Sequence, residues 1–398
     1  MITPPKSDKF ILLFICLISG VFYSHFWISL GRGYFWDFKV YEEAVSQFSG
    51  GNDPYQSSAL LFVYHPYVIY FLSALNRLVE IRYIFFVLYA VVSIYALWQL
   101  HEFMKICAGL KQKKAPLLLD VAVIIIAAVC FGNAGTLSIL SGNVSPFIHL
   151  WLLSLVIGHV RKKDRIFPWL FAASVFILSM VKPYFLAYLL FGGIFWNPRT
   201  WAATSVAVIL MASCLWLSAL WFMPDLYNSF ETSLHDQILN RNQADLGYSF
   251  FGILKPIVND VKVALALHGA IMIFLYYFLM IWLPKKYVSE RAPYLKMLLL
   301  VPIVVLSNPR MMGYDFPIAM LAWFVFLYLT DTKHYAKVVL CGVLIALFPI
   351  KYYFARKLQI LSSSAPAFDD TYWQIIAFSL MLVIHTWNNA RSNKMAEV

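Results

Sequence analysis

A carboxylate lies within an aromatic cluster at the end of the first long apolar run of the chain. Asp37 follows the flexible segment 31–33 and lies in the stretch YFWDF, residues 34–38. A carboxylate held in a partly apolar pocket becomes more basic, so it can remove a proton from a hydroxyl group. Aspartate is also a common helix N-cap. The sequence therefore leaves two roles open for Asp37, general base and helix cap.

Two cationic residues are placed where they could bind a phosphate group. Lys182 stands beside Pro183 in MVKPYF, and Arg310 is the only arginine of the segment SNPRMMGYDF. The planar guanidinium of arginine binds phosphate oxygens in pairs, whereas lysine binds them as a point charge. Each residue also has a simpler interpretation. A lysine at a helix end often extends to the membrane surface, and Arg310 could form a structural ion pair with Asp315.

Polar and aromatic side chains near these residues are candidates for substrate contacts. Asn143 and Ser145 in LSGNVSPF precede a predicted helix, so either could equally be an N-cap. The segment 240–252 mixes hydrogen-bonding groups with aromatic rings, which suits sugar binding. We expect substrate contacts from Tyr41, Tyr55, Tyr64, His65, Asn143, Asn242, Gln243, Tyr314 and Asp315.

Several other kinds of chemistry have no signature in the sequence. His65 and His235 are the histidines expected in outer loops, and neither has a second ligand at metal spacing. The sequence has no Gly-rich phosphate loop and no Asp-x-Asp motif. The five cysteines are scattered, mostly within apolar runs, and are expected to pack there. We therefore expect no cofactor and no metal requirement.

The composition indicates an integral membrane protein. Of the 398 residues, 61% are hydrophobic and 13% are charged, whereas soluble proteins carry about 25% charged residues. The first apolar run, residues 10–30, is too long for the core of a signal peptide and long enough to cross a bilayer as a helix. We predict an all-α polytopic membrane protein with a single integral-membrane domain, residues 1–398.

The distribution of charge predicts how the chain crosses the membrane. The predicted spans are 10–30, 82–104, 117–131, 144–160, 166–181, 184–197, 201–222, 263–283, 294–307, 316–330, 336–350 and 371–388. Most of the 31 Lys and Arg residues then lie on one side, and most Asp and Glu residues lie on the other. The positive-inside rule places both termini in the cytoplasm and Asp37 outside. The net charge of +11 is therefore a topology signal and does not indicate nucleic-acid binding.

The outer side holds the structured segments that must position these residues. The stretch 65–78 is apolar but short, and counting it as a span would invert every later loop. We expect it to lie at the outer surface within a first outer loop, 31–81, together with an amphipathic helix over 40–48. A second large outer loop covers 223–262. Since the cytoplasmic loops are short, any chemistry belongs on the outer side.

Six short patches occur in one order along the chain. They are WDFKVYEEA…GGNDPYQ, VYHPY, LSGNVSPF, VKPYF, NRNQADLGYS and SNPRMMGYDF. The series resembles the bacterial alpha-1,2-mannosyltransferase-like family of integral-membrane glycosyltransferases, within the GT-C superfamily. The resemblance implies many transmembrane helices, a polyprenyl-phosphate sugar as donor, and an acidic catalytic residue in the first outer loop.

Carried over residue by residue, the resemblance makes Asp37 the catalytic carboxylate. Tyr64 and Pro66 match the family's Tyr-x-Pro element, and Lys182 matches a Lys-x-x-Pro-like element only approximately. LSGNVSPF is an imperfect match to a Gly-Gln-x-Asn type of element. Family members often carry a histidine before the last tyrosine, where this chain has Gly313. Arg310 or Asp315 would take the role of that histidine.

The expected reaction transfers a sugar, mannose or another hexose or pentose, to a glycan, lipid or protein acceptor outside the cell. Asp37 would remove the proton of the acceptor hydroxyl, and polyprenyl phosphate would leave from the opposite face of the sugar, giving inversion. Lys182 and Arg310 would compensate the charge of the leaving phosphate. Two alternatives remain open at this point: an O-antigen-type polymerase or ligase, and a polytopic transporter.

Overall fold

The computed structural model describes most of the first 330 residues. The described ranges are 34–56, 62–109, 140–162, 166–236, 249–258, 260–279 and 292–330, with single positions between 14 and 28 and between 121 and 138. Every regular element in these ranges is a helix, which confirms the all-α fold class. The predicted spans 336–350 and 371–388, and most of 10–30 and 117–131, lie outside the described residues.

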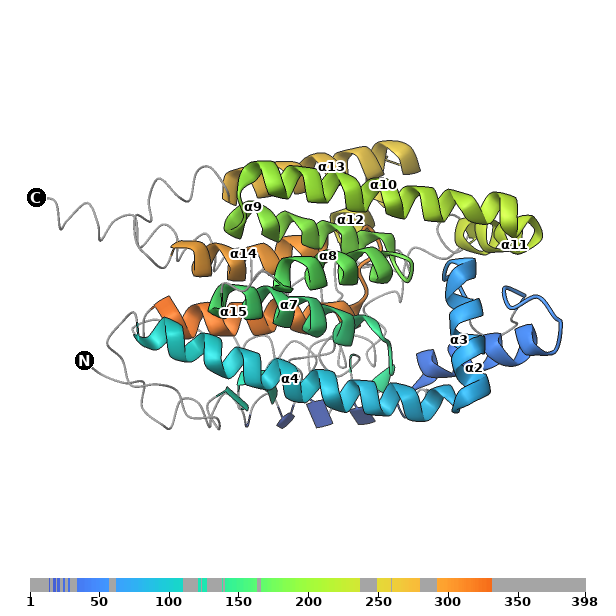
Figure 1. Ribbon diagram of the computed structural model, residues 1–398, viewed down its shortest axis with the longest axis horizontal. Helices are drawn as coiled ribbons and strands as arrows, with labels where there is room; N and C mark the ends of the chain where they lie inside the picture. Colours follow the sequence, from blue (N-terminus) through green and yellow to red (C-terminus); the bar gives the residue numbers. More distant parts are fainter. Residues whose placement is uncertain are drawn as a thin grey trace, which may run out of the picture.

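Seven helices run side by side along the long axis of the molecule (Figure 1). They are α4 (Ile81–Gly109), α7 (Ser145–Lys162), α8 (Ile166–Ser179), α10 (Pro198–Phe222), α13 (Val261–Tyr277), α14 (Ala292–Leu306) and α15 (Phe316–Thr330). Helix α4 packs against α7, α7 against α8, and α14 against α15. Short connections return the chain after α7 and after α14, so each of these helices is antiparallel to its successor.

Two of these helices have the length and apolarity needed to cross a membrane. Among the described residues they are Ile81–Cys107 and Pro198–Phe222, with mean hydropathies of 1.8 and 2.0. Only 17% of the most apolar window of each is buried inside the protein. A core helix of a soluble protein would be mostly buried, because exposed apolar surface is unfavourable in water. Four further apolar helices are shorter, so a count of twelve spans stays a prediction.

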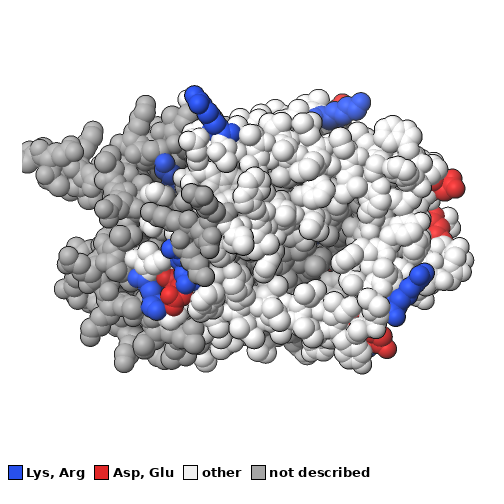
Figure 2. All heavy atoms as spheres, viewed as in Figure 1, with Lys and Arg blue, Asp and Glu red and all other residues white. Residues whose placement is uncertain are grey.

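Charged side chains are absent from the middle of the visible face of the described part. Figure 2 shows the Lys, Arg, Asp and Glu residues gathered toward the two ends of the long axis, with uncharged surface between them. Large apolar side chains are exposed along the long helices, among them Val91 and Ile94 of α4 and Leu210 of α10. This distribution is the one expected where the middle of a helix bundle faces lipid.

Three shorter helices gather at one end of the bundle (Figure 1). They are α2 (Trp36–Ser49), α3 (Pro66–Leu78) and α11 (Pro224–His235). Helix α3 lies across the ends of the long helices, which agrees with the prediction that 65–78 is not a span. Buried side chains of α2 and α3 form a core of their own with Phe230 of α11, separate from the core between the long helices.

The region predicted as a second outer loop contains regular structure. Within 223–262 the chain forms α11 and α12 (Phe250–Val258), and α12 packs against α13. The first of these helices begins at Pro224, a residue suited to the first helical turn because its missing N–H has no intrahelical partner there. The segment predicted as the second outer loop therefore contains two helices, and its side of the membrane stays a prediction.

Pro183 separates two helical segments, as predicted. Helix α8 ends at Ser179, and the chain then folds back against α8 as η1 (Pro183–Phe191), a nine-residue 3-10 helix, followed by α9 (Gly192–Phe195). The predicted span 184–197 is thus a continuous helical segment, Pro183–Phe195, most of it wound as a 3-10 helix. The tight winding is supported by Trp201 of α10, whose indole N–H donates to the Leu189 carbonyl at 2.7 Å. A long 3-10 segment of this kind is unusual in proteins.

The first turn of α2 is attached to the turn before α7. The backbone N–H of Phe35 donates to the Leu140 carbonyl at 2.7 Å, and that of Asp37 donates to the Ser141 carbonyl at 2.9 Å. These bonds satisfy donors that a helix N-terminus leaves unpaired. Phe35 is the N-cap residue and has a positive φ of 56°. Since Asp37 lies inside the first turn, its predicted role as helix cap is wrong, and the helix begins four residues before the predicted 40–48.

Gly142 makes this close approach possible. Its φ is +66°, and a Cβ at this position would lie 2.8 Å from Cδ1 and 3.2 Å from the Cα of Phe35. Only glycine has neither the steric penalty of the left-handed backbone nor a side chain that would collide with Phe35. Any larger residue would separate α2 from the turn before α7.

Replacing Gly142 with alanine is expected to destabilise the protein more than the same change at Gly51. Gly51 also has a positive φ, +79°, but a Cβ there would have no atom within 4 Å. Gly51→Ala should lower the free energy of unfolding by about 1–2 kcal/mol from backbone strain. Gly142→Ala should cost a further ~1–3 kcal/mol from overpacking. Denaturant unfolding in detergent micelles measures both, and equal losses would contradict the described contact.

Candidate functional site

Asn143 joins Asp37 of α2 to the start of α7. Its side-chain amide donates to Oδ2 of Asp37 at 2.9 Å, and its Oδ1 accepts from the backbone N–H of Ser145 at 2.9 Å. Asn143 itself is buried, and Asp37 is half-buried. Asn143 therefore satisfies the first backbone N–H of α7, as a helix cap does, and its predicted contact with a ligand stays a prediction.

The ammonium group of Lys182 points into the protein beside the same turn. Its Nζ donates to Oγ of Ser145 at 2.5 Å and lies 5.2 Å from the ring centroid of Tyr314 and 5.9 Å from that of Tyr184. The ion pairs among the described residues do not include Lys182. Burial lowers the pKa of Lys182, while the negative charges of Asp315 and Asp37 oppose that shift. Its side chain does not extend to the membrane surface.

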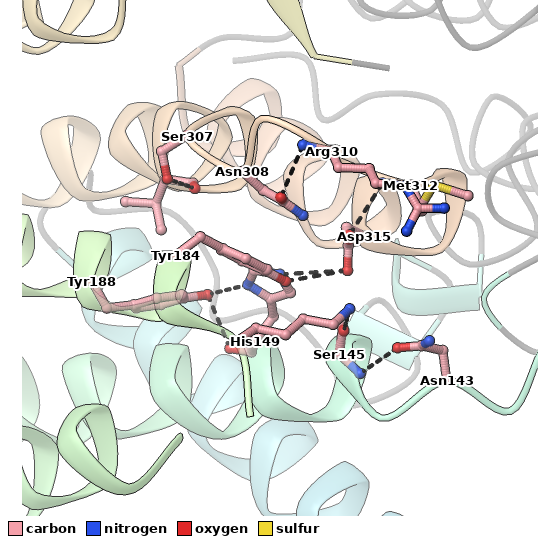
Figure 3. Close-up of polar contacts among 12 residues, drawn as sticks. Asn143, Ser145, His149, Tyr184, Tyr188, Ser307, Asn308, Arg310, Met312 and Asp315 are labelled. Carbon is pink, nitrogen blue, oxygen red and sulfur yellow. Dashed lines mark hydrogen bonds and ion pairs between the residues drawn. The ribbon is translucent and has the colours of Figure 1, made fainter. Parts of the chain in front are cut away.

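Asp315 is the second carboxylate of the site and is 1% exposed. Figure 3 shows its contacts: Oδ1 accepts from the Tyr184 hydroxyl at 3.4 Å and lies 3.8 Å from Nε2 of His149, and Oδ2 accepts from the backbone N–H of Met312 at 3.2 Å. Burial raises the pKa of Asp315, and the positive charge of Lys182 opposes this rise. These contacts differ from the ion pair with Arg310 that the sequence allowed.

Arg310 lies in the turn between α14 and η6 (Gly313–Asp315). Its backbone N–H donates to Oδ1 of Asn308 at 3.1 Å, which fixes the turn. The charge of Arg310 contributes to lowering the pKa of Lys182, so the two cations are close enough to repel each other. Two positive charges held this near to each other favour an anion between them or beside them.

Tyr41 and Tyr64 form a buried hydroxyl pair next to Asp37. Their hydroxyl oxygens lie 2.7 Å apart, and Tyr55 donates its hydroxyl to the Tyr64 carbonyl at 2.7 Å. Burial raises the pKa of Tyr41 and of Tyr64, and the negative charge of Asp37 adds to both shifts. The hydroxyls are therefore neutral hydrogen-bonding groups near neutral pH. Tyr55 packs against Phe62 in the small core that α2 and α3 form with Phe230.

His65 is placed away from these residues. Its Nδ1 accepts from the backbone N–H of Tyr67, capping α3, and its Nε2 lies 3.3 Å from the Trp216 carbonyl. Burial lowers the pKa of His65 to about 4, so the ring is neutral near pH 7. The structure thus gives His65 a role in holding α3 against α10. Asn242 and Gln243 lie outside the described residues.

Three functional candidates were not selected from the sequence. His149, Tyr184 and Tyr188 fall inside predicted spans. In the structure, hydrogen bonds connect them to one another and to Asp315. A signal was present: His149 is the fifth residue of α7, and Tyr184 and Tyr188 follow shortly after the Pro183 break. Polar residues at such positions are costly in lipid and usually functional.

The candidate site, defined as Asp37, Tyr41, Tyr64, Asn143, Ser145, Lys182, Arg310, Tyr314 and Asp315, draws on five separate segments of the chain. Two carboxylates and two cations balance in formal charge. Among the described residues, no group of three or more His, Cys, Asp or Glu side chains could hold a metal ion. Comparison with models of protein families, with curated proteins and with solved structures finds no match for this chain.

Substitutions at Asn143 separate its two hydrogen bonds. Asn143→Ala removes the bond to Ser145 and the bond to Asp37, and should lower the free energy of unfolding by about 2–4 kcal/mol. Asn143→Ser keeps an N-capping oxygen but is too short to reach Asp37, so it should recover about 1 kcal/mol. Denaturant unfolding in detergent micelles measures the difference. Equal destabilisation by the two variants would mean that the capping bond contributes nothing.

Proposed function

We propose that this chain is a membrane glycosyltransferase acting at the outer face of a bacterial inner membrane. It transfers a sugar, mannose or another hexose or pentose, from a polyprenyl-phosphate donor to a glycan, lipid or protein acceptor. The proposal includes the twelve-span topology with both termini in the cytoplasm, and the family resemblance carried by the six sequence patches. It requires no metal ion.

The observation that carries the proposal is the hydrogen-bonded connection between a carboxylate and a cation from distant segments. Asp37 contacts Asn143 at 2.9 Å, Asn143 contacts Ser145 at 2.9 Å, and the Ser145 hydroxyl accepts from Lys182 at 2.5 Å. Glycosyl transfer from a lipid phosphate needs a base on one side of the sugar and a cation at the leaving phosphate on the other. This connection holds both groups at one end of the bundle.

The reaction follows from these positions. Asp37 accepts the proton of the acceptor hydroxyl as its oxygen attacks the anomeric carbon, and the bond from that carbon to the phosphate oxygen breaks. The electron pair leaves with polyprenyl phosphate, whose developing charge is compensated by Lys182 and Arg310. Attack and departure on opposite faces invert the anomeric configuration.

The tyrosines supply the uncharged part of the site. Tyr41, Tyr64 and Tyr314 present neutral hydroxyls, since burial raises the pKa of each and nearby carboxylates add to the rise. Neutral hydroxyls and aromatic rings match a sugar, which offers hydroxyl groups and apolar C–H faces. Asn242 and Gln243 stay predicted contacts of the acceptor or sugar.

A transporter is supported less well. Transporters keep ionisable residues near the bilayer midplane on discontinuous helices. Here Pro183 lies in a hairpin, because η1 folds back against α8 instead of continuing its direction. The site also draws on the first turn of α2, the first turn of α7 and the turn before α15, and Figure 1 shows α2 at one end of the bundle.

Loss of the Asp37 carboxyl base is expected to abolish transfer. In a strain lacking this chain, mass spectrometry of glycolipids and surface polysaccharide should show a missing hexose or pentose, restored by the wild-type chain. Asp37→Asn, nearly isosteric, should fail to restore it, because a general base contributes about 10²–10⁴-fold to rate. Asp37→Glu is the control that keeps the base and should restore part of the signal.

Two outcomes would count against the proposal. Restoration of the sugar by Asp37→Asn at wild-type level would remove Asp37 from the reaction. Shortened polymers that retain every sugar would indicate a polymerase or ligase, and an unchanged set of glycans with altered solute uptake would indicate a transporter.

Removal of either phosphate-binding cation should weaken use of the donor. With the donor identified by mass spectrometry, Lys182→Ala and Arg310→Ala should each raise the KM for it by about tenfold or more, the loss expected for a hydrogen bond to a charged group. Lys39→Ala is the matched control, because Lys39 is exposed on α2 two residues from Asp37. A similar KM increase in Lys39→Ala would show that net charge, not phosphate contact, is responsible.

A further inference from the structure

A series of buried hydrogen bonds connects Tyr188, His149 and Tyr184 to Asp315. These hydrogen bonds take no part in the reaction described above. Nδ1 of His149 lies 2.8 Å from the Tyr188 hydroxyl, and its Nε2 lies 3.2 Å from the Tyr184 hydroxyl. The Tyr184 hydroxyl in turn lies 3.4 Å from Oδ1 of Asp315 (Figure 3). Three side chains thus lead in sequence to the buried carboxylate.

The carboxylate of Asp315 fixes the donor and the acceptor of each hydrogen bond in this series. An ionised carboxylate only accepts hydrogen bonds, so the Tyr184 hydroxyl donates a hydrogen bond to Asp315. The Tyr184 oxygen then accepts from the Nε2–H of His149. With the proton on Nε2, Nδ1 is the acceptor and receives the Tyr188 hydroxyl. The position of Asp315 therefore selects one tautomer of a neutral imidazole.

The imidazole has little freedom to turn away from this arrangement. His149 is fully buried, and its ring packs at 5.1 Å from the ring centroid of Phe185 and 5.8 Å from that of Tyr184. A buried carboxylate needs donated hydrogen bonds to stay ionised. Asp315 receives them from the backbone of Met312 and from the hydroxyls of Ser145 and Tyr184, and the orientation of the Tyr184 hydroxyl depends on His149.

The series of hydrogen bonds leads to Asp315, whose charge acts on Lys182, a cation of the candidate site. Among the charges that act on Lys182, Asp315 makes the largest contribution to keeping its ammonium protonated. The ring of Tyr184 also lies 5.9 Å from the ammonium, so one side chain contacts both charges. A change at His149 should therefore reach Lys182 through Tyr184 and Asp315.

We propose that His149 is a positioning residue, which acts through Tyr184 to hold Asp315 ionised and oriented, and thereby holds Lys182 as the ammonium that binds a lipid-linked phosphate. This inference rests on the proposed function and assigns a further residue to its donor site. The competing interpretation is that His149 merely fills space between α7 and η1.

Amide substitutions distinguish the two nitrogens of the ring. In His149→Gln the amide nitrogen can reach the position of Nε2 and donate to Tyr184. In His149→Asn the shorter side chain reaches only the position of Nδ1. Glutamine is close to histidine in volume and asparagine is smaller, so packing alone would also favour glutamine, and Tyr184→Phe, which keeps the ring and removes only the hydroxyl, tests the hydrogen bond apart from packing. A role as Nε2–H donor predicts that only glutamine rescues.

The experiment measures binding of geranyl phosphate, a short isoprenoid monophosphate, to the full chain in detergent micelles by isothermal titration calorimetry. His149→Asn and Tyr184→Phe should each weaken binding by about tenfold, the loss of one hydrogen bond that supports a charged group. His149→Gln should stay within about threefold of the wild type. The double variant His149→Asn/Tyr184→Phe should bind no more weakly than either single variant, because both changes interrupt one path.

The controls separate this inference from the proposed function. If Lys182→Ala abolishes binding but His149→Asn and Tyr184→Phe bind as the wild type does, the positioning role is overturned and the donor site stands. Equal losses in His149→Gln and His149→Asn, or additive losses in the double variant, would also overturn it. If the wild-type chain does not bind geranyl phosphate at all, the proposed donor site fails and this inference fails with it.

Discussion

The contact between Asp37 and Asn143 is the interaction on which the arrangement of the site depends. It joins α2, which belongs to the small core at one end of the molecule, to the first turn of α7, which belongs to the main core. The neighbouring backbone bonds from Phe35 to Leu140 and from Asp37 to Ser141 act in parallel with it. Because Gly142 allows the two backbones to meet, a carboxylate from the first outer loop reaches side chains more than a hundred residues later in the chain.

Charge balance explains why the site tolerates so many buried ionisable groups. A lone buried charge is costly, whereas the candidate site contains two carboxylates, Asp37 and Asp315, and two cations, Lys182 and Arg310. Hydroxyl groups connect the charges: Ser145 accepts from Lys182, and Tyr184 donates to Asp315. An incoming phosphate would add a negative charge beside the cations.

Local patterns in the sequence predicted where helices form more successfully than they predicted which side chains contact one another. Long apolar runs predicted the helices, and Pro183 predicted the break before η1, because both follow from properties of the neighbouring residues. The sequence also selected Asp37, Asn143, Lys182 and Asp315, which the structure brings together. It missed His149 and Tyr184, since a position within an apolar run does not show which residues of other helices lie opposite. It did not show that His65 caps α3 and contacts Trp216, because that contact depends on tertiary packing.

The central claim is that this end of the molecule transfers a sugar from a lipid-linked phosphate with Asp37 as the base. The most direct measurement supplies the purified chain in proteoliposomes with polyprenyl-phosphate hexoses and pentoses and a glycolipid extract as acceptor. Release of polyprenyl phosphate is then followed by mass spectrometry. We expect the wild-type chain to release it from one donor only when the acceptor is present, and Asp37→Asn to release none. Release from no donor, or equal release by wild type and Asp37→Asn, would contradict the claim.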